Sequence, residues 1–555
     1  MFHRLPLRYS AHVIRSNLKT IAPAGRWLRA GAAVAAAATL FIFSFAWNNG
    51  FVDLDDSGYI LNNRHIDSLN WDTVVWAFTR FHEANWHPLT MLSLALDRRI
   101  WGLVPFGFHA TNVLIHCGTV FLVCFVFRDL LKRVPAAMPP AISTWFVNVG
   151  SICAALLFGL HPLRVESVVW ASERKDVLCT FFFVATLWWY LRYISARAAT
   201  PQESKKRLLA YGMALVMAGC ALMSKPTAVS LPLVLLILDW YPLARVTGRE
   251  RLLAALKEKL PLFLMALGTA LLTIRAQQYP MTKAPDVDAL SRFLVACKAL
   301  LFYLWKMLWP AALAPYYPHP GRITQGRLVE FLPYAVAVCV AAAAAVVAFI
   351  KRCRLLPALF FFYCVTLAPM LGVVQVGGQW MADRYSYLPA LGISLLWGGG
   401  AAWITGLFWY TGRRCAAIAV AGAVVCQLTV YSVMTRQQIK VWGSTETLAS
   451  REIELYPDHA GAAYVSRSRY RMEHGRCEPA LDDIDRAMSI ALRNTLRDKY
   501  AQLSMARAQI LLCLHRSDDA LAAADWAVQT ASPEQLPEIL EFRRQMPGYH
   551  QHPER

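Results

Sequence analysis

Twelve apolar runs, each about as long as a bilayer-spanning helix, constrain this chain more than any other feature. They accompany a composition that is 57% apolar and only 17% charged, whereas soluble domains have roughly 45–50% apolar and about 25% charged residues. The sequence therefore predicts an all-α, polytopic membrane protein and argues against a soluble enzyme. The runs are 29–47, 107–127, 142–160, 177–194, 208–223, 227–243, 260–276, 294–310, 331–350, 355–374, 385–408 and 415–434.

The amino-terminal residues indicate on which side of the membrane the chain starts. Residues 1–29 contain six Lys and Arg and no acid, and the apolar run after them ends at Ala46-Trp47 without a small-residue cleavage site. We predict an uncleaved first helix with its N-terminus in the cytoplasm. We expect a multi-pass protein located in a bacterial inner membrane.

The charge pattern favours eleven crossings over twelve. If every run crossed, the basic clusters at 351–354 and 413–414 would lie outside, although cytoplasmic loops usually carry the Lys and Arg. Both clusters return to the cytoplasm if 294–310 does not cross. That run carries Lys298 and Lys306, which suits an interfacial or re-entrant helix. Eleven crossings place the C-terminal tail on the periplasmic or luminal side.

The chain divides by charge density into a membrane body, 1–434, and a soluble tail, 435–555. The tail holds 16 Lys and Arg against 17 Asp and Glu, so the basic excess of the whole chain belongs to the body. Small and apolar residues of the tail recur at an offset of 40, which suggests paired helices like those of tetratricopeptide repeats, with generic amphipathic helices as the alternative. The recurring residues are Ala480, Ile484 and Ala487, followed by Ala520, Ala524 and Ala527.

Several classes of function find no support in the sequence. The patterns GxxxxGK[ST], HExxH, GxSxG and CxxC are all absent, so nucleotide hydrolysis, zinc proteolysis, hydrolase chemistry and thiol redox chemistry are not indicated. Basic residues punctuate apolar runs rather than cover a polar domain, so nucleic acid is not an expected partner. Cys477 and Cys513 in the tail could pair, but we favour free cysteines at helix-packing positions.

The first predicted outer loop, 48–106, carries two adjacent acids, Asp55 and Asp56, just past a membrane helix. Carboxylates at such a place can act as a general base or hold a cation that binds phosphate. One of them could instead only cap the next helix. A divalent metal stays open, because the other oxygen ligands cannot be assigned from spacing.

Basic residues occur on other loops of the same predicted face. Arg174 and Lys175 stand where a helix enters the membrane, Lys225 is isolated between two apolar runs, and Arg384 opens another crossing. Ionisable residues at these places indicate a functional site, and both Arg and Lys bind phosphate. The alternatives are internal ion pairs, snorkelling of Lys225, and pairing of Arg384 with Asp383. The supporting residues are Glu173, Asp176, Asp383, His87 and Glu166.

Together these residues predict transfer chemistry on a lipid phosphate. The cations Arg174, Lys175, Lys225 and Arg384 are candidates to stabilise a departing phosphate. Either Asp55 or Asp56 is the candidate to deprotonate an acceptor hydroxyl. His87 is more simply a structural loop residue, and Glu166 is a candidate second acid.

With these residues in view, the chain resembles the GT-C class of membrane glycosyltransferases. Within that class it looks like the transmembrane, tetratricopeptide-containing O-mannosyltransferases that act on cadherins, and like their bacterial relatives. The resemblance rests on motifs that follow in order along the chain: 52–56 (VDLDD), 85–90 (NWHPLT), 105–112 (PFGFHATN), 161–168 (HPLRVESV), 173–176 (ERKD), 224–226 (SKP) and 381–387 (MADRYSY).

The resemblance implies a catalytic acid in the first outer loop, a polyprenyl-phosphate-linked sugar as donor, and repeats beside the active site. Carried onto this sequence, Asp55 or Asp56 is the base, and the four cations are the candidates for the donor phosphate. The expected partners are the lipid-linked donor, a protein or glycan acceptor, the lipid bilayer, and a protein bound by the tail. The tail is short for this family, which leaves the sugar and the acceptor open.

Two rival hypotheses come from other classes of protein. One is a membrane-anchored tetratricopeptide scaffold for envelope assembly, without catalysis. The other is a transporter or flippase of lipid-linked intermediates, which would place ionisable residues along a path at mid-membrane. Here most of them lie at helix ends, which favours transfer over transport.

Overall fold

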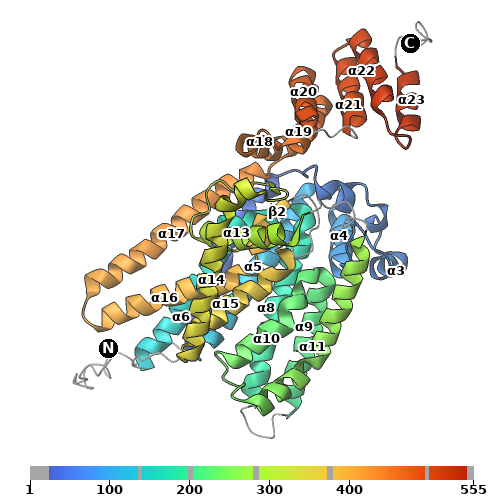
Figure 1. Cartoon of the computed structure of the whole chain (residues 1–555). Coiled ribbons are helices and arrows are strands. Elements are labelled where there is room, and N and C mark those ends of the chain that lie inside the picture. Colours follow the sequence, from blue (N-terminus) through green and yellow to red (C-terminus); the bar gives the residue numbers. More distant parts are fainter. Residues whose placement is uncertain are drawn as a thin grey trace.

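The computed structural model describes residues 24–134, 140–197, 204–278, 287–371, 379–493 and 499–546. Long helices lie side by side in a body, and a smaller group of helices is stacked on one end of it (Figure 1). Among the described residues, eight helices are long and apolar enough to cross a membrane. They are α2 (Ala24–Phe43), α5 (Pro105–Leu131), α8 (Arg174–Arg197), α9 (Ser204–Ser224), α11 (Arg249–Ala276), α14 (Leu328–Ile350), α16 (Ala390–Tyr410) and α17 (Arg414–Val441).

The other predicted runs also contain helices, but these helices are broken or short. Helix α6 (Pro140–Gly159) reaches a span only together with the residues up to Val169, across a bend of 57°. Helices α10 (Leu231–Trp240) and α15 (Leu355–Leu367) belong to shorter apolar helical segments. Helix α13 (Ala289–Leu308) is not among the candidate spans. The all-α, polytopic class predicted from the sequence is thus confirmed, and eleven crossings remain our expectation.

The bend after α6 builds one wall of the site. Pro162 lacks a backbone N–H and follows an extended residue, so the chain leaves the helix there. It continues through three short helical turns before α8 begins. These are η4 (Pro162–Arg164), α7 (Val165–Val169) and η5 (Ala171–Glu173).

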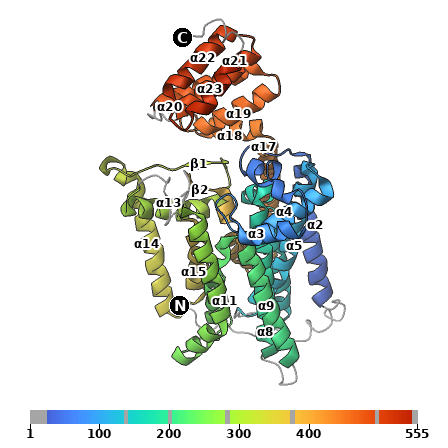
Figure 2. The ribbon, with the colours of Figure 1, turned by 90° about the vertical axis from the view of Figure 1, so that its right-hand side faces the viewer.

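The end of the body next to the tail also carries two helices of the first loop and a small sheet (Figure 2). The helices are α3 (Trp71–Thr79) and α4 (Pro88–Trp101). Strand β1 (Tyr317–Pro318) pairs antiparallel with β2 (Gln379–Met381), with Tyr317 opposite Met381. A turn, η10 (Asp383–Ser386), follows β2, and the guanidinium of Arg164 holds it by donating to the carbonyl oxygen and the hydroxyl of Ser386, at 3.1 and 3.0 Å.

The tail consists of α18 (Thr445–Leu455), α19 (Gly461–Glu473), α20 (Cys477–Arg493), α21 (Tyr500–Cys513), α22 (Ser517–Thr530) and α23 (Leu536–Arg544). The recurring residues of the sequence occupy corresponding buried positions on α20 and α22. The turns before these helices correspond as well, since Gly475 and His515, which are 40 residues apart, both have positive φ (71° and 57°). The helix-pair repeat predicted from the offset of 40 is therefore visible in the backbone.

The tail contains a disulfide between Cys477 and Cys513, which joins the start of α20 to the end of α21. Our expectation of free cysteines was wrong at this pair. Both residues are spaced to pack between helices, and sequence spacing alone does not show that the same packing brings the two sulfur atoms together. Disulfides persist mainly in oxidising compartments.

The tail is fixed to the body through the first outer loop (Figure 2). Helix α17 runs on to Val441, past the predicted boundary at 434, and leads directly into α18. Asn49 donates to the carbonyl oxygens of Ile439 and Trp442, both at 3.1 Å. The backbone N–H of Asp53 donates to the Thr445 hydroxyl at 2.8 Å. The loop that carries the acids is thereby held beneath the tail.

Candidate active site

Glu173, at the end of η5, is the centre of an ion cluster at the end of the body next to the tail (Figure 1). Its side chain is 1% exposed and contacts three cations from three separate segments of the chain. Its Oε1 lies 3.0 Å from Lys175 Nζ and 3.4 Å from Arg384 Nε, and its Oε2 lies 3.4 Å from Lys225 Nζ. The structure therefore brings together three of the four predicted phosphate-binding cations.

Lys175 connects this cluster to the first outer loop. Its Nζ lies 3.1 Å from Asp55 Oδ2 and stands over the rings of Tyr59 and Trp170, 4.6 and 5.6 Å from their centroids. The Asp55 side chain is 47% exposed, whereas that of Lys175 is only 9% exposed. Asp55 is thus an open carboxylate held next to a largely buried ammonium group.

Arg384 and Lys225 each have a second acidic partner. The guanidinium of Arg384 pairs with Glu166 Oε1, and its backbone N–H donates to Glu166 Oε2 at 2.8 Å. Lys225 pairs with Asp176, which also accepts from the Ser167 hydroxyl at 3.1 Å. Arg384 does not use the neighbouring Asp383, so the alternative that we considered for this arginine is not what the structure shows.

Arg174 lies apart from the cluster, although it is next to Lys175 in the sequence. Its guanidinium is fully buried, and it pairs with Asp97 and Asn112 and donates to the Ser93 hydroxyl at 2.7 Å. It also donates to the Phe108 carbonyl at 3.0 Å. These internal partners correct our expectation for Arg174, because no donor of the guanidinium faces open space.

The two adjacent acids of the first loop have different environments. The side chain of Asp56 is buried and accepts hydrogen bonds from the backbone N–H groups of Val52, at 3.0 Å, and Ser172, at 2.9 Å. Burial raises the pKa of Asp56 to about 6, against the lowering by these two hydrogen bonds. Asp56 therefore ties the loop to η5, and Asp55 is the carboxylate that reaches open space.

His87 and Asp383 lie behind the cluster. His87 is 2% exposed and stacks on Tyr59 at 5.4 Å, and burial lowers its pKa well below the usual value, with a further lowering by the charge of Lys175. It is thus a neutral packing residue.

Asp383 is also buried and accepts a hydrogen bond from the Tyr317 hydroxyl at 2.8 Å. Burial, followed by the charge of Glu166, raises the pKa of Asp383 well above its usual value.

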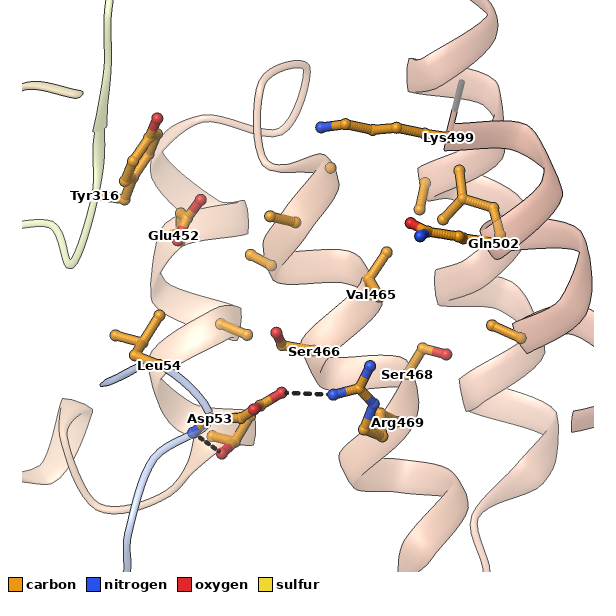
Figure 3. A pocket seen from close by; sticks show the side chains of 18 of the residues that line it. Asp53, Leu54, Tyr316, Glu452, Val465, Ser466, Ser468, Arg469, Lys499 and Gln502 are labelled. Carbon is orange, nitrogen blue, oxygen red and sulfur yellow. Dashed lines mark hydrogen bonds and ion pairs between the residues drawn. The ribbon is translucent and has the colours of Figure 1, made fainter. Parts of the chain in front are cut away.

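A groove of about 1230 Å³ opens between this end of the body and the tail. Asp55, Trp170, Tyr316 and Arg384 line it from the body. Figure 3 shows the part toward the tail, where Asp53 pairs with Arg469 and Glu452 stands beside Tyr316. Asp55 and Arg384, which are more than 300 residues apart in the sequence, thus face one cavity.

Some residues of this site were not predicted. Trp170 lies under both Lys175 and Arg384, and Tyr59 lies under Lys175. Both lie in segments that we singled out for their charged residues. An aromatic ring close to a cation of these loops is the sequence signal that could have identified them. No sequence signal pointed to Glu452, because its position in the groove depends on how the tail packs on the body. Within the described ranges, no group of three or more His, Cys, Asp or Glu could hold a metal ion.

The fold and the site define a multi-pass membrane protein with paired acids and bases at one end of its helices, beneath a helical-repeat tail. The resemblance stated from the motifs is confirmed: the curated relatives of this chain are protein O-mannosyl-transferases. Protein O-mannosyl-transferase TMTC1 of Homo sapiens is 24% identical over 509 residues, which cover 83% of this chain and 54% of the human protein. Tmtc2 of Drosophila melanogaster is 33% identical over 156 residues, 28% of this chain and 15% of that protein.

This chain therefore spans about half the length of the human relative. No family model matches it. Among solved structures, the oligosaccharyltransferase of Archaeoglobus fulgidus is 12% identical over 75% of this chain and 55% of that chain, with a TM-score of 0.41. ArnT from Cupriavidus metallidurans is 15% identical over 92% of this chain and 84% of that chain, with a TM-score of 0.36.

Proposed function

We propose that this chain is an integral-membrane glycosyltransferase that moves a sugar from a polyprenyl-phosphate donor to a hydroxyl group of a protein. The observation that carries the proposal is the open carboxylate of Asp55, held 3.1 Å from Lys175 in a groove that Arg384 also lines. The names of the relatives support a sugar transfer to protein, with mannose as the first sugar to test.

In the proposed reaction, Asp55 accepts the proton of the acceptor hydroxyl as its oxygen attacks the anomeric carbon of the sugar. The bond from that carbon to the donor phosphate breaks, and the lipid phosphate leaves with the bonding electron pair. Lys175 and Arg384, with Lys225 behind them, stabilise the departing negative charge. Their location at the ends of apolar helices suits a donor whose polyprenyl tail stays in the bilayer.

The shared use of Lys175 gives the proposal an order of events. Lys175 contacts Asp55 on one side and Glu173 on the other, at 3.1 and 3.0 Å. A phosphate that binds Lys175 competes with Asp55 for the same ammonium group, so donor binding releases the carboxylate toward the acceptor. While no donor is bound, Asp55 stays paired with Lys175 and is a poor base toward water.

We also propose that the site and the tail lie on the extracytoplasmic side. The disulfide between Cys477 and Cys513 supports this placement, since such bonds persist in oxidising compartments. The predicted cytoplasmic charges support it as well. Helices α11 and α17 begin with basic residues at the end of the body remote from the tail (Figure 1).

A reconstituted transfer assay tests the proposal. Proteoliposomes that contain the full chain receive polyprenyl-phosphate mannose and a threonine-containing peptide, and labelled mannose on the peptide is measured. We expect transfer by the wild type and by Asp72→Asn, a control in the same loop with an exposed side chain. A protein that binds the donor lipid but transfers no sugar from any polyprenyl-phosphate donor to any hydroxyl acceptor would contradict the proposal.

A further inference from the structure

The groove beside Asp55 continues far beyond the ion cluster. Its lining passes from Asp55 and Arg384 across α18 and α19 to α21 and α23 of the tail. A sugar and a single hydroxyl-bearing side chain occupy only the end next to Asp55, so most of its volume of about 1230 Å³ is available to the rest of an acceptor.

The part of the groove within the tail has two exposed amide side chains on one helix. Gln502 and Gln509 lie on α21, and both line the groove. Residues seven apart share one face of a helix, with a rise of about 10 Å between them, which matches roughly three residues of an extended chain. A side-chain amide both donates and accepts a hydrogen bond, as a peptide group does.

The floor between the amides and the facing helix is apolar and partly built of small side chains. Ala463 on α19, Ala487 and Ala491 on α20, and Ala506 on α21 all line the groove. Figure 3 shows Gln502 on one side of this space, with Val465 of α19 on the other. Small side chains allow a main chain to approach the floor closely, while its amide groups reach Gln502 and Gln509.

The distribution of aromatic rings in the groove indicates whether its lining suits an oligosaccharide or a polypeptide acceptor. Proteins hold oligosaccharides largely by stacking sugar rings on Trp, Tyr or Phe. Among the described residues that line the groove, Trp170 and Tyr316 supply such rings, and both belong to the body at the site end. The tail contributes amides, hydroxyls and aliphatic groups, together with the charged side chains of Glu452, Arg469, Glu473, Lys499 and Glu538. This lining suits main-chain recognition, in which backbone hydrogen bonds supply affinity.

We infer that the tail holds an extended polypeptide segment of the acceptor, with Gln502 and Gln509 bound to its main chain, and so presents a hydroxyl to Asp55. This inference deepens the proposed function and rests on it for the chemistry at Asp55. It assigns main-chain binding to the tail, so that a wide range of sequences can enter the same groove.

Peptide binding to the full chain tests the inference without any catalysis. A fluorescent threonine-containing peptide of about 12 residues is titrated with detergent-solubilised protein, and its anisotropy is measured without donor. In the double variant Gln502→Ala/Gln509→Ala we expect affinity to fall by about 10- to 30-fold, because two amide hydrogen bonds are lost. Gln529→Ala, an exposed glutamine of α22 outside the groove, should bind like the wild type.

Equal binding by the wild type and the double variant would overturn the inference, as would no peptide binding by the wild type. Tighter binding of a maltodextrin than of the peptide would also overturn it, in favour of a glycan acceptor. A transfer assay then separates the two proposals. The double variant should raise the KM of the long peptide by a similar factor and leave transfer to a capped single threonine unchanged. Absence of all transfer, with the peptide affinities as expected, would reject the proposed function and retain the groove.

Discussion

Replacement of Lys175 by methionine probes the proposed phosphate contact directly. Lys175→Met keeps most of the side chain's length and its packing on Tyr59, and it removes the charge that faces Asp55 and Glu173. Two unit charges about 4 Å apart interact by about 4 kcal/mol at an effective dielectric constant near 20. Arg384 and Lys225 remain in the cluster, and part of the lysine's charge is already neutralised. The net loss is therefore closer to that of one charged hydrogen bond, about 1.5–3 kcal/mol.

This loss corresponds to about a 10- to 100-fold weaker affinity for a polyprenyl phosphate. The affinity can be measured by calorimetry on protein in nanodiscs. Lys298→Met is a matched control, since Lys298 also stands over an aromatic ring, 4.6 Å from the centroid of Phe331, on α13 and outside the cluster. An unchanged affinity in a folded Lys175→Met protein, or an equal loss in Lys298→Met, would refute the assignment of Lys175.

Three further predictions concern parts of the site and the tail. The pKa of Asp56 rises from 3.8 to about 6 in the folded chain, so the folded state binds more protons between about pH 4 and 6. The free energy of unfolding should therefore fall by up to about 3 kcal/mol as pH rises through that window, and thermal unfolding of Asp56→Asn should lack this pH dependence. Arg174→Met leaves Asp97 buried without its cation, so thermal unfolding should show a loss of about 3–5 kcal/mol, with polyprenyl-phosphate affinity retained. Reduction of the disulfide, whose cysteines are 36 residues apart, should destabilise the tail by about 3–4 kcal/mol in denaturant titrations.

The helices and their grouping could be predicted because hydropathy is a local property. Each apolar run contains a helix. The charge pattern sets 294–310 apart, and its helix α13 is not among the candidate spans, as α10 and α15 are not, so the absence of a crossing there stays our prediction. The gathering of the outer loops also followed from parity along the chain. Once the run 294–310 is not counted as a crossing, Asp55 and Arg384 must lie on one side, and the structure places both at one groove.

The roles of adjacent residues could not be predicted, because they depend on distant partners. Arg174 and Lys175 are neighbours, but successive residues of a helix point about 100° apart. Arg174 meets Asp97 on α4, whereas Lys175 meets Asp55 of the first loop. The same holds for Asp56, which is buried and accepts a hydrogen bond from the distant backbone N–H of Ser172. Sequence spacing identifies such pairs as candidates, and packing then assigns one member to the interior.

If donor binding releases Asp55 from Lys175, the Asp55→Asn and Lys175→Met substitutions should change the affinity for polyprenyl phosphate in opposite directions. Asp55→Asn removes a competitor for the ammonium group, so it should strengthen polyprenyl-phosphate binding. Because the Asp55 side chain is 47% exposed, the gain is that of a surface pair, about 2- to 5-fold. Weaker binding by Asp55→Asn in the same calorimetric assay would argue that Asp55 and the phosphate do not share Lys175.

The central claim is that Asp55 takes the proton of the acceptor. Single-turnover transfer from preloaded polyprenyl-phosphate mannose to a threonine peptide measures this step apart from donor binding and product release. We predict that Asp55→Asn lowers the transfer rate by at least about 100-fold, with the donor still bound, and that the Asp72→Asn control reacts at the wild-type rate. A transfer rate in Asp55→Asn within a few-fold of the wild type would contradict the account.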